Sequence, residues 1–141
     1  MLWRCRTLYT SALEQRKTWW QRGQGKAATR FQQEAELKDL RPAFPDYAAI
    51  HSQVLQDVLV RLERTYQTCF RRVQADEQAG SPRFQGRNRS HSCTYTEYGN
   101  GAHLDNGLLV LSKIGRIAVR WSRPLVGTPK TVTISQEADG W

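Results

Sequence analysis

The sequence predicts an α+β fold, in which a helical bundle over residues 1–78 precedes a small antiparallel β-barrel over residues 79–141. In the first half, apolar residues recur at intervals of three and four, which is the period of amphipathic helices. In the second half, short β-prone runs are separated by glycine and proline turns. A basic loop, residues 80–95, joins the two halves. We therefore expect a helical domain and a β domain connected by a basic junction.

The first predicted helix covers residues 2–22, and Gly23 with Gly25 supplies its stop signal. The adjacent Trp19 and Trp20 fall at helical spacing, which favours a place in the core over a base-stacking platform. The apolar stripe otherwise consists of Cys5, Leu8, Tyr9, Ala12 and Leu13, and the opposite, solvent-facing side carries Arg6, Glu14, Arg16 and Lys17.

Thr29 is placed to cap a second helix that runs to about Arg41, where Pro42 and Pro45 close it. Its expected inward residues are Phe31, Ala35, Leu37 and Leu40. Arg30, near the start of this helix, is a candidate contact for a nucleic-acid backbone, although exposed basic residues are usually only solvated.

A third helix from Ser52 to about Ala75 has the clearest apolar pattern, made of Val54, Leu55, Val58, Leu59, Leu62, Tyr66, Cys69, Phe70 and Val73. Ser52 is a plausible N-cap, which leaves Gln53 and Gln56 on the first exposed turn. Glutamine can pair with adenine, so this turn either reads bases or is merely solvated. The connector 42–50 is too long for the tight turn of a helix-turn-helix motif.

Strands are predicted at Leu108–Leu111, Ile117–Trp121 and Thr131–Ser135, and Asn106-Gly107 is a strong hairpin signal. Several short antiparallel strands suggest an open barrel of the oligonucleotide-binding kind. Between residues 106 and 136 there are five basic residues and no acid, which favours a binding face: Lys113, Arg116, Arg120, Arg123 and Lys130.

The net charge of +8 indicates a polyanionic partner. Nucleic acid fits better than a membrane surface, because the sequence contains no long apolar segment or lipidation motif. In the basic loop, Arg83, Arg87 and Arg89 lack neighbouring acids and can grip phosphates, while Phe84 and Tyr95 offer rings to bases or to the core. The alternative is a solvated linker between the two halves.

Catalytic chemistry is not indicated by these residues. The three cysteines form no close pair, which favours a reduced, intracellular setting, and each histidine is isolated. The acids of the second half fall in predicted loops or near the end: Glu97, Asp105, Glu137 and Asp139. We therefore expect no metal site, no cofactor and no catalytic residue, and interpret the chain as a nucleic-acid-binding module.

Five segments in collinear order, together with the basic loop, resemble the TnpB/OrfB family, the transposon-encoded proteins related to type V CRISPR effectors. The sequence from Leu111 to Trp121, for example, is similar to the family's L-P-K-I-G-x-I-K-V-R-W. The others are Tyr9–Arg16, Leu37–Pro45, Ser52–Arg72, Thr131–Gly140, and the basic-loop pair Gly80–Phe84 with Ser92–Tyr95. Together they cover nearly the whole chain.

The resemblance implies a helical recognition domain and a β-barrel wedge domain that bind a structured guide RNA and double-stranded DNA beside its target. It places Ser52, Gln53, Gln56, Thr94 and Tyr95 near the target-adjacent motif. It assigns backbone contacts to Arg83, Arg87, Arg89, Lys113, Arg116 and Arg120. We expect such a protein in the cytoplasm, at the nucleoid.

Several features depart from the family pattern. Gln85-Gly86, Cys93 and Ser112 replace family residues that are respectively basic, aromatic and proline, so we expect reduced RNA affinity. The first wedge strand should precede Met1, and the RuvC-like domain, which cuts DNA with carboxylate-bound magnesium, should follow Trp141. The expectation is an incomplete barrel whose open edge is prone to association, and no cleavage by this chain.

Three functions follow from these expectations. The favoured one is a non-catalytic nucleic-acid-binding fragment of a transposase-associated, RNA-guided endonuclease. The second is one subunit of a split magnesium-dependent endonuclease, completed by a RuvC domain on a separate chain. The third is an inactive, poorly folded transposon remnant.

Overall fold

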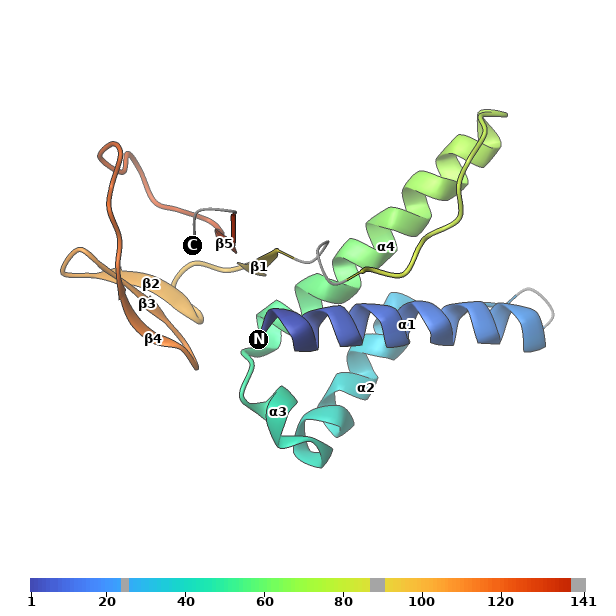
Figure 1. The fold of residues 1–141 in the computed structure, drawn as a ribbon, viewed down its shortest axis with the longest axis horizontal. Coiled ribbons are helices and arrows are strands. Elements are labelled where there is room, and N and C mark those ends of the chain that lie inside the picture. Colours follow the sequence, from blue (N-terminus) through green and yellow to red (C-terminus); the bar gives the residue numbers. More distant parts are fainter. Residues whose placement is uncertain (24–25, 87–90, 138–141) are drawn as a thin grey trace.

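The computed structural model describes residues 1–23, 26–86 and 91–137 of the chain. The helices gather at one end of the molecule and the strands at the other (Figure 1). The helices are α1 (Leu2–Arg22), α2 (Arg30–Ala43), α3 (Pro45–Ala48) and α4 (Ser52–Gln74). The strands are β1 (Ser92–Tyr95), β2 (Ala102–Asp105), β3 (Leu108–Leu111), β4 (Gly115–Ala118) and β5 (Val132–Ser135). The predicted α+β class is confirmed.

The helix boundaries agree well with the sequence pattern. Gly23 ends α1, and its backbone N–H donates to the carbonyl of Trp19. Thr29 caps α2 through a capping box with Gln32, in which each side chain bonds the other residue's backbone N–H. The connector after α2 holds a short helix, α3, which the sequence reading did not predict.

The N-cap of α4 is His51, so the prediction of Ser52 was wrong by one residue. His51 has extended backbone angles, and its Nδ1 accepts a bond from the backbone N–H of Gln53 at 3.4 Å. An imidazole nitrogen can take the place of the serine or aspartate oxygen that usually caps a helix. Ser52 therefore becomes the first helical residue.

The predicted apolar stripes are buried only where helices cross. The core of the helical half is made of Cys5, Leu8, Tyr9, Ala12, Leu13, Leu37, Tyr47, Ile50, Val54, Leu55, Val58, Leu59 and Leu62. Beyond the crossing, aromatic residues expected inside are exposed: Trp19, Trp20, Phe31 and Phe70. The core assignment of the paired tryptophans was therefore wrong, and Ala35 and Val73 are exposed as well.

The strands form two separate antiparallel sheets rather than the predicted barrel. β1 pairs with β5, and β2, β3 and β4 form a meander in that order. The segment 119–131 links β4 to β5 without a strand, and it contains two prolines that cannot donate to a ladder. Because β4 therefore pairs only with β3 within the described ranges, the sheets do not close.

The Asn106-Gly107 hairpin is confirmed, since both residues have positive φ (49° and 80°) and join β2 to β3. The next strand lies two residues earlier than predicted. Lys113 also takes a positive φ, so the turn after β3 is tight and pairing resumes at Gly115, opposite Leu111. Strands β1 and β2 were not predicted.

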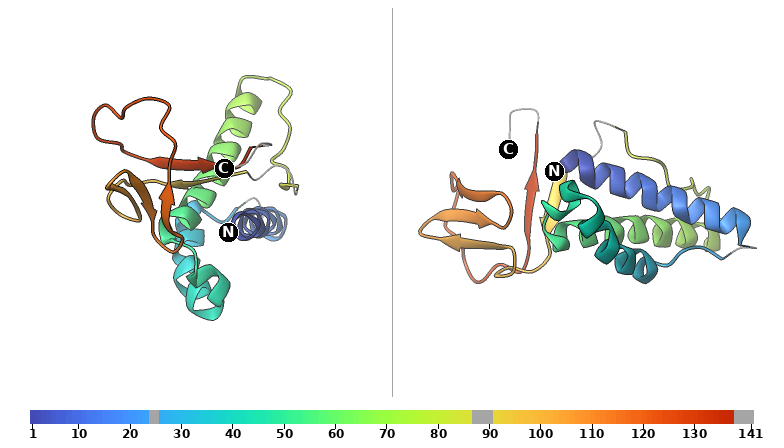
Figure 2. Two further views of the ribbon diagram at one scale, coloured as in Figure 1. Left: turned by 60° about the vertical axis from the view of Figure 1, so that its left-hand side comes forward. Right: turned by 90° about the horizontal axis from the view of Figure 1, so that it is seen from below.

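One hydrophobic core joins the two halves of the chain. Cys93, Tyr95, Ala102 and Leu111 belong to the same buried cluster as the helical residues. Figure 2 shows β1 beside the helices and the three-stranded sheet farther away. The division into two domains at residue 78 stays a prediction, and the core crosses that boundary.

Candidate nucleic-acid interface

A basic groove of about 560 Å³ runs between α4 and the segment that follows it. We call it the arginine groove, and its lining residues are Arg64, Thr65, Thr68, Cys69, Arg72 and residues 80–83. Positions 64, 68 and 72 are four residues apart, so they share one face of α4. Three arginines and no acid are among the residues that line this groove, and arginine is a residue type that binds phosphate groups.

The arginines of this groove are available to a ligand. Arg64 and Arg83 are exposed. Arg72 lies 3.9 Å from Glu77, but both side chains are more than half exposed, so the ion pair is weak and an arriving phosphate can replace it. Guanidinium groups bind phosphate oxygens through two parallel N–H bonds, which also fixes their orientation.

The segment with Arg83 is held against the helices by its neighbours. Pro82 is buried, and the ammonium of Lys17 on α1 lies 4.6 Å from the ring centroid of Phe84. Arg83 thus comes from an anchored segment rather than from a solvated linker. Arg87 and Arg89, the other two arginines of the predicted basic loop, lie outside the described residues.

The three residues predicted as contacts at the start of α4 differ in their exposure. Gln56 is exposed, as predicted, and Ser52 is half-buried. Gln53 is buried, so its predicted exposure was wrong. Its side-chain amide donates to the Glu97 carboxylate at 3.2 Å, and its oxygen accepts from the Glu97 backbone N–H at 3.3 Å. Gln53 therefore attaches the loop between β1 and β2 to the helix.

Thr94 and Tyr95 lie against the core of the protein. The Arg61 guanidinium donates to the Thr94 hydroxyl at 2.7 Å and to the Ser92 backbone carbonyl at 3.2 Å. Tyr95 has no exposed surface, and its hydroxyl donates to the Ser112 carbonyl at 3.1 Å. The Tyr95 ring was expected either to stack on bases or to pack in the core, and the structure shows it in the core.

The basic residues of the β half are spread over turns and strand edges. Lys113 and Arg120 are exposed, and Arg116 on β4 lies 3.4 Å from the carboxylate of Asp105 on β2. The acid-free stretch 106–136, which favoured a binding face, begins one residue after Asp105. Because β2 and β4 both pair with β3, the Asp105 carboxylate lies beside Arg116, and this face therefore carries an acid. On the helical side, Arg30 is half-buried and lies 3.2 Å from Glu34.

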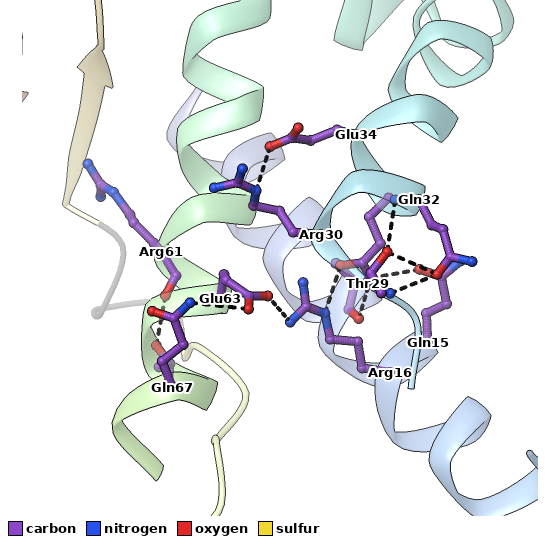
Figure 3. Close-up of polar contacts among 12 residues, drawn as sticks. Gln15, Arg16, Thr29, Arg30, Gln32, Glu34, Arg61, Glu63 and Gln67 are labelled. Atoms are coloured by element: carbon purple, nitrogen blue, oxygen red, sulfur yellow. Dashed lines mark hydrogen bonds and ion pairs between the residues drawn. The ribbon is translucent and has the colours of Figure 1, made fainter. Parts of the chain in front are cut away.

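Arg16 is buried, so its predicted place on the solvent-facing side of α1 was wrong. Its side chain is 4% exposed. Nε donates to Gln33 on α2 at 2.9 Å, and Nη1 donates to Glu63 on α4 at 2.7 Å, so one guanidinium connects three helices (Figure 3). The Gln33 amide donates in turn to the Ala12 carbonyl. Nη2 has no partner among the described residues.

A comparison with curated proteins identifies a relative of this chain. Over 92 residues it is 37% identical to the Escherichia coli K12 protein named "Putative RNA-guided DNA endonuclease InsQ". The resemblance to the TnpB/OrfB family is confirmed. The match covers 64% of this chain and 21% of InsQ, so the chain spans about a fifth of the length of that relative. No family model matches the chain.

Burial controls the titration of several groups in this TnpB-like chain. It raises the pKa of the Cys5 thiol to about 11 and the pKa of the Tyr95 hydroxyl to about 12. The pKa of Cys93 is also raised by burial, and that of His51 is lowered by burial together with the charges of Arg41 and Lys113. None of these groups lines the arginine groove.

Within the described ranges, no three His, Cys, Asp or Glu side chains are placed to hold a metal ion. No helix there is both long enough and apolar enough to cross a membrane.

Proposed function

We propose that this chain binds structured guide RNA and double-stranded DNA beside its target, as the nucleic-acid-binding part of a TnpB-like RNA-guided endonuclease. The observation that carries the proposal is the arginine groove, in which Arg64, Arg72 and Arg83 line one surface without an acid. The similarity to InsQ, named as an RNA-guided DNA endonuclease, supports the choice of nucleic acid. DNA cleavage and its magnesium would belong to a RuvC-like domain.

The predicted contact residues differ in exposure and in their neighbours, and therefore in the role that we propose for each. Arg83, in the arginine groove, is the principal backbone contact. Lys113 and Arg120 extend the basic surface onto the β half. Gln56 and Ser52, at the start of α4, contact the target-adjacent DNA. Gln53, Thr94 and Tyr95 do not contact it but stabilise the surrounding structure through the hydrogen bonds described above.

A salt series tests the proposal. The affinity of the purified chain for structured RNA copied from its own locus is measured beside a duplex DNA of the same length. We expect RNA binding that weakens steeply with salt, because each phosphate contact contributes roughly 0.7 to 0.9 to the log-log slope.

Two results would count against the proposed function. Weak, equal binding to both nucleic acids would favour the inactive remnant, which retains charge without specificity. Cleavage of DNA by the purified chain with Mg²⁺ would contradict the absence of a catalytic role.

A further inference from the structure

A second groove, of about 760 Å³, adjoins the arginine groove. We call it the aromatic groove. Its lining residues include Arg16 and four aromatic residues, Trp20, Phe31, Tyr66 and Phe70. Cys69, Ser81 and Pro82 line both grooves, so the two are contiguous.

The rings of the aromatic groove are unusually open to solvent. Trp20 is 57% exposed, Phe31 70% and Phe70 55%, and they come from α1, α2 and α4 respectively. Three exposed large rings around one concave surface indicate a place for a flat apolar ligand, because leaving such area in water is unfavourable. Nucleic-acid bases stack on rings of this kind irrespective of sequence.

The charges of this groove favour an anion-bearing ligand. Its lining includes Arg16, Lys17 and Arg30 against a single acid, Glu63, which already accepts from Arg16. The Arg16 guanidinium is buried and held by Gln33 and Glu63, so it adds positive charge to the wall of the groove.

We infer that the aromatic groove holds one unstacked base of an RNA whose phosphates lie in the adjoining arginine groove. Trp20 and Phe70 stack on the base. Such a pocket recognises a bulged or looped nucleotide, since a paired base cannot enter it. The inference rests on the proposed RNA binding and adds a structural specificity to it.

The test uses one RNA hairpin with a single-nucleotide bulge that carries either inosine or an abasic residue. Affinities are measured with the purified chain by fluorescence anisotropy across a salt series. We expect the inosine hairpin to bind about tenfold more tightly than the abasic one, because only inosine offers a ring for stacking.

Neighbouring tryptophans provide the matched variants. Trp20→Ala removes a ring that lines the aromatic groove, whereas Trp19→Ala removes an exposed ring of the same helix that does not line it. Trp20→Ala and Phe70→Ala should each reduce the preference for the inosine hairpin over the abasic hairpin to less than threefold. Both should leave the slope of affinity against salt unchanged. Trp19→Ala should keep the full preference.

The outcomes separate this inference from the function on which it rests. Salt-dependent binding with equal affinity for both hairpins would overturn the base pocket and leave the proposed function standing. If no hairpin binds in a salt-dependent way, the proposed function itself fails.

Discussion

Arg61 of α4 donates to the hydroxyl of Thr94 on β1 at 2.7 Å, across a sequence separation of 33 residues. Its Nε lies 2.6 Å from the carboxylate of Asp57, one helical turn earlier. Because Asp57 is 7% exposed, this arginine both neutralises a buried acid and attaches the first strand to the helix. Arg61 therefore stabilises the junction between the two halves.

Replacement of Arg61 should destabilise the protein. We expect Arg61→Met to lower the free energy of unfolding by about 2 kcal/mol, because Asp57 keeps its charge without this partner and Thr94 loses a donor. Urea denaturation measures the loss. Arg64→Ala, on the next turn but exposed, should change stability by less than about 0.5 kcal/mol and weaken RNA binding instead. Equal destabilisation by the two changes would refute the role of Arg61.

Stability should depend on the charge of His51. Its folded-state pKa lies below the ordinary 6.5, because burial, and then Arg41 and Lys113, disfavour the imidazolium. The folded chain thus binds this proton less readily than the unfolded chain. The stability that the neutral His51 contributes to the fold is complete above pH 6.5 and is lost as the pH falls through the lowered pKa.

The melting temperature between pH 7 and pH 5 measures this effect. We expect it to fall for the wild type and to fall less for His51→Asn, since asparagine also caps helices but does not titrate in this range. The same slope in both proteins would mean that His51 does not titrate as inferred.

Gly101 lies against the ring of His51. A Cβ at Gly101 would stand 2.6 Å from His51 Cε1, and the residue has a φ of +97°. Gly99 has a similar φ of +92°, but a Cβ there meets nothing within 4 Å. Both alanine variants are strained, and Gly101→Ala should cost about 1 to 3 kcal/mol more because of the clash. Thermal melts of both variants check the difference; no difference would place His51 elsewhere.

The three cysteines should react at different rates. Cys5 and Cys93 are 3% and 2% exposed, and burial raises the pKa of both thiols, so the reactive thiolate is scarce and shielded. Cys69 is partly exposed in the grooves. At pH 8 a colourimetric thiol reagent should label one cysteine rapidly and the other two only after unfolding. A Cys69→Ser variant that still shows a fast thiol would contradict this order.

The helices could be predicted from the sequence because their signals are local. The stripe through Leu55, Leu59 and Leu62 sets the buried face of α4, and the pair Thr29 and Gln32 fixes the start of α2. The same stripe did not show where burial stops. Phe70 continues it, yet nothing in the described part of the chain covers this ring, which is 55% exposed.

The site could be predicted only in part, because its important contacts join distant segments. Arg83 was found from an arginine cluster beside Pro82, whereas the sequence analysis did not predict Arg64 and Arg72 as site residues. Arg16 has partners that lie 17 and 47 residues away, and nothing in its immediate neighbours indicates burial. The pairing of β1 with β5 likewise depends on register across a long separation.

The most direct test of the central claim is the salt dependence of RNA binding when the arginine groove loses its charge. We expect the triple variant Arg64→Ala, Arg72→Ala, Arg83→Ala to lower the log-log slope by about 2 to 3, since up to three phosphate contacts disappear. The control removes the same charge elsewhere on the helical half: Arg6→Ala, Arg22→Ala, Lys38→Ala. A control slope close to that of the wild type, together with the reduced slope of the groove variant, is the predicted result. Equal loss of slope in both triple variants would show that net charge, rather than this groove, binds the RNA.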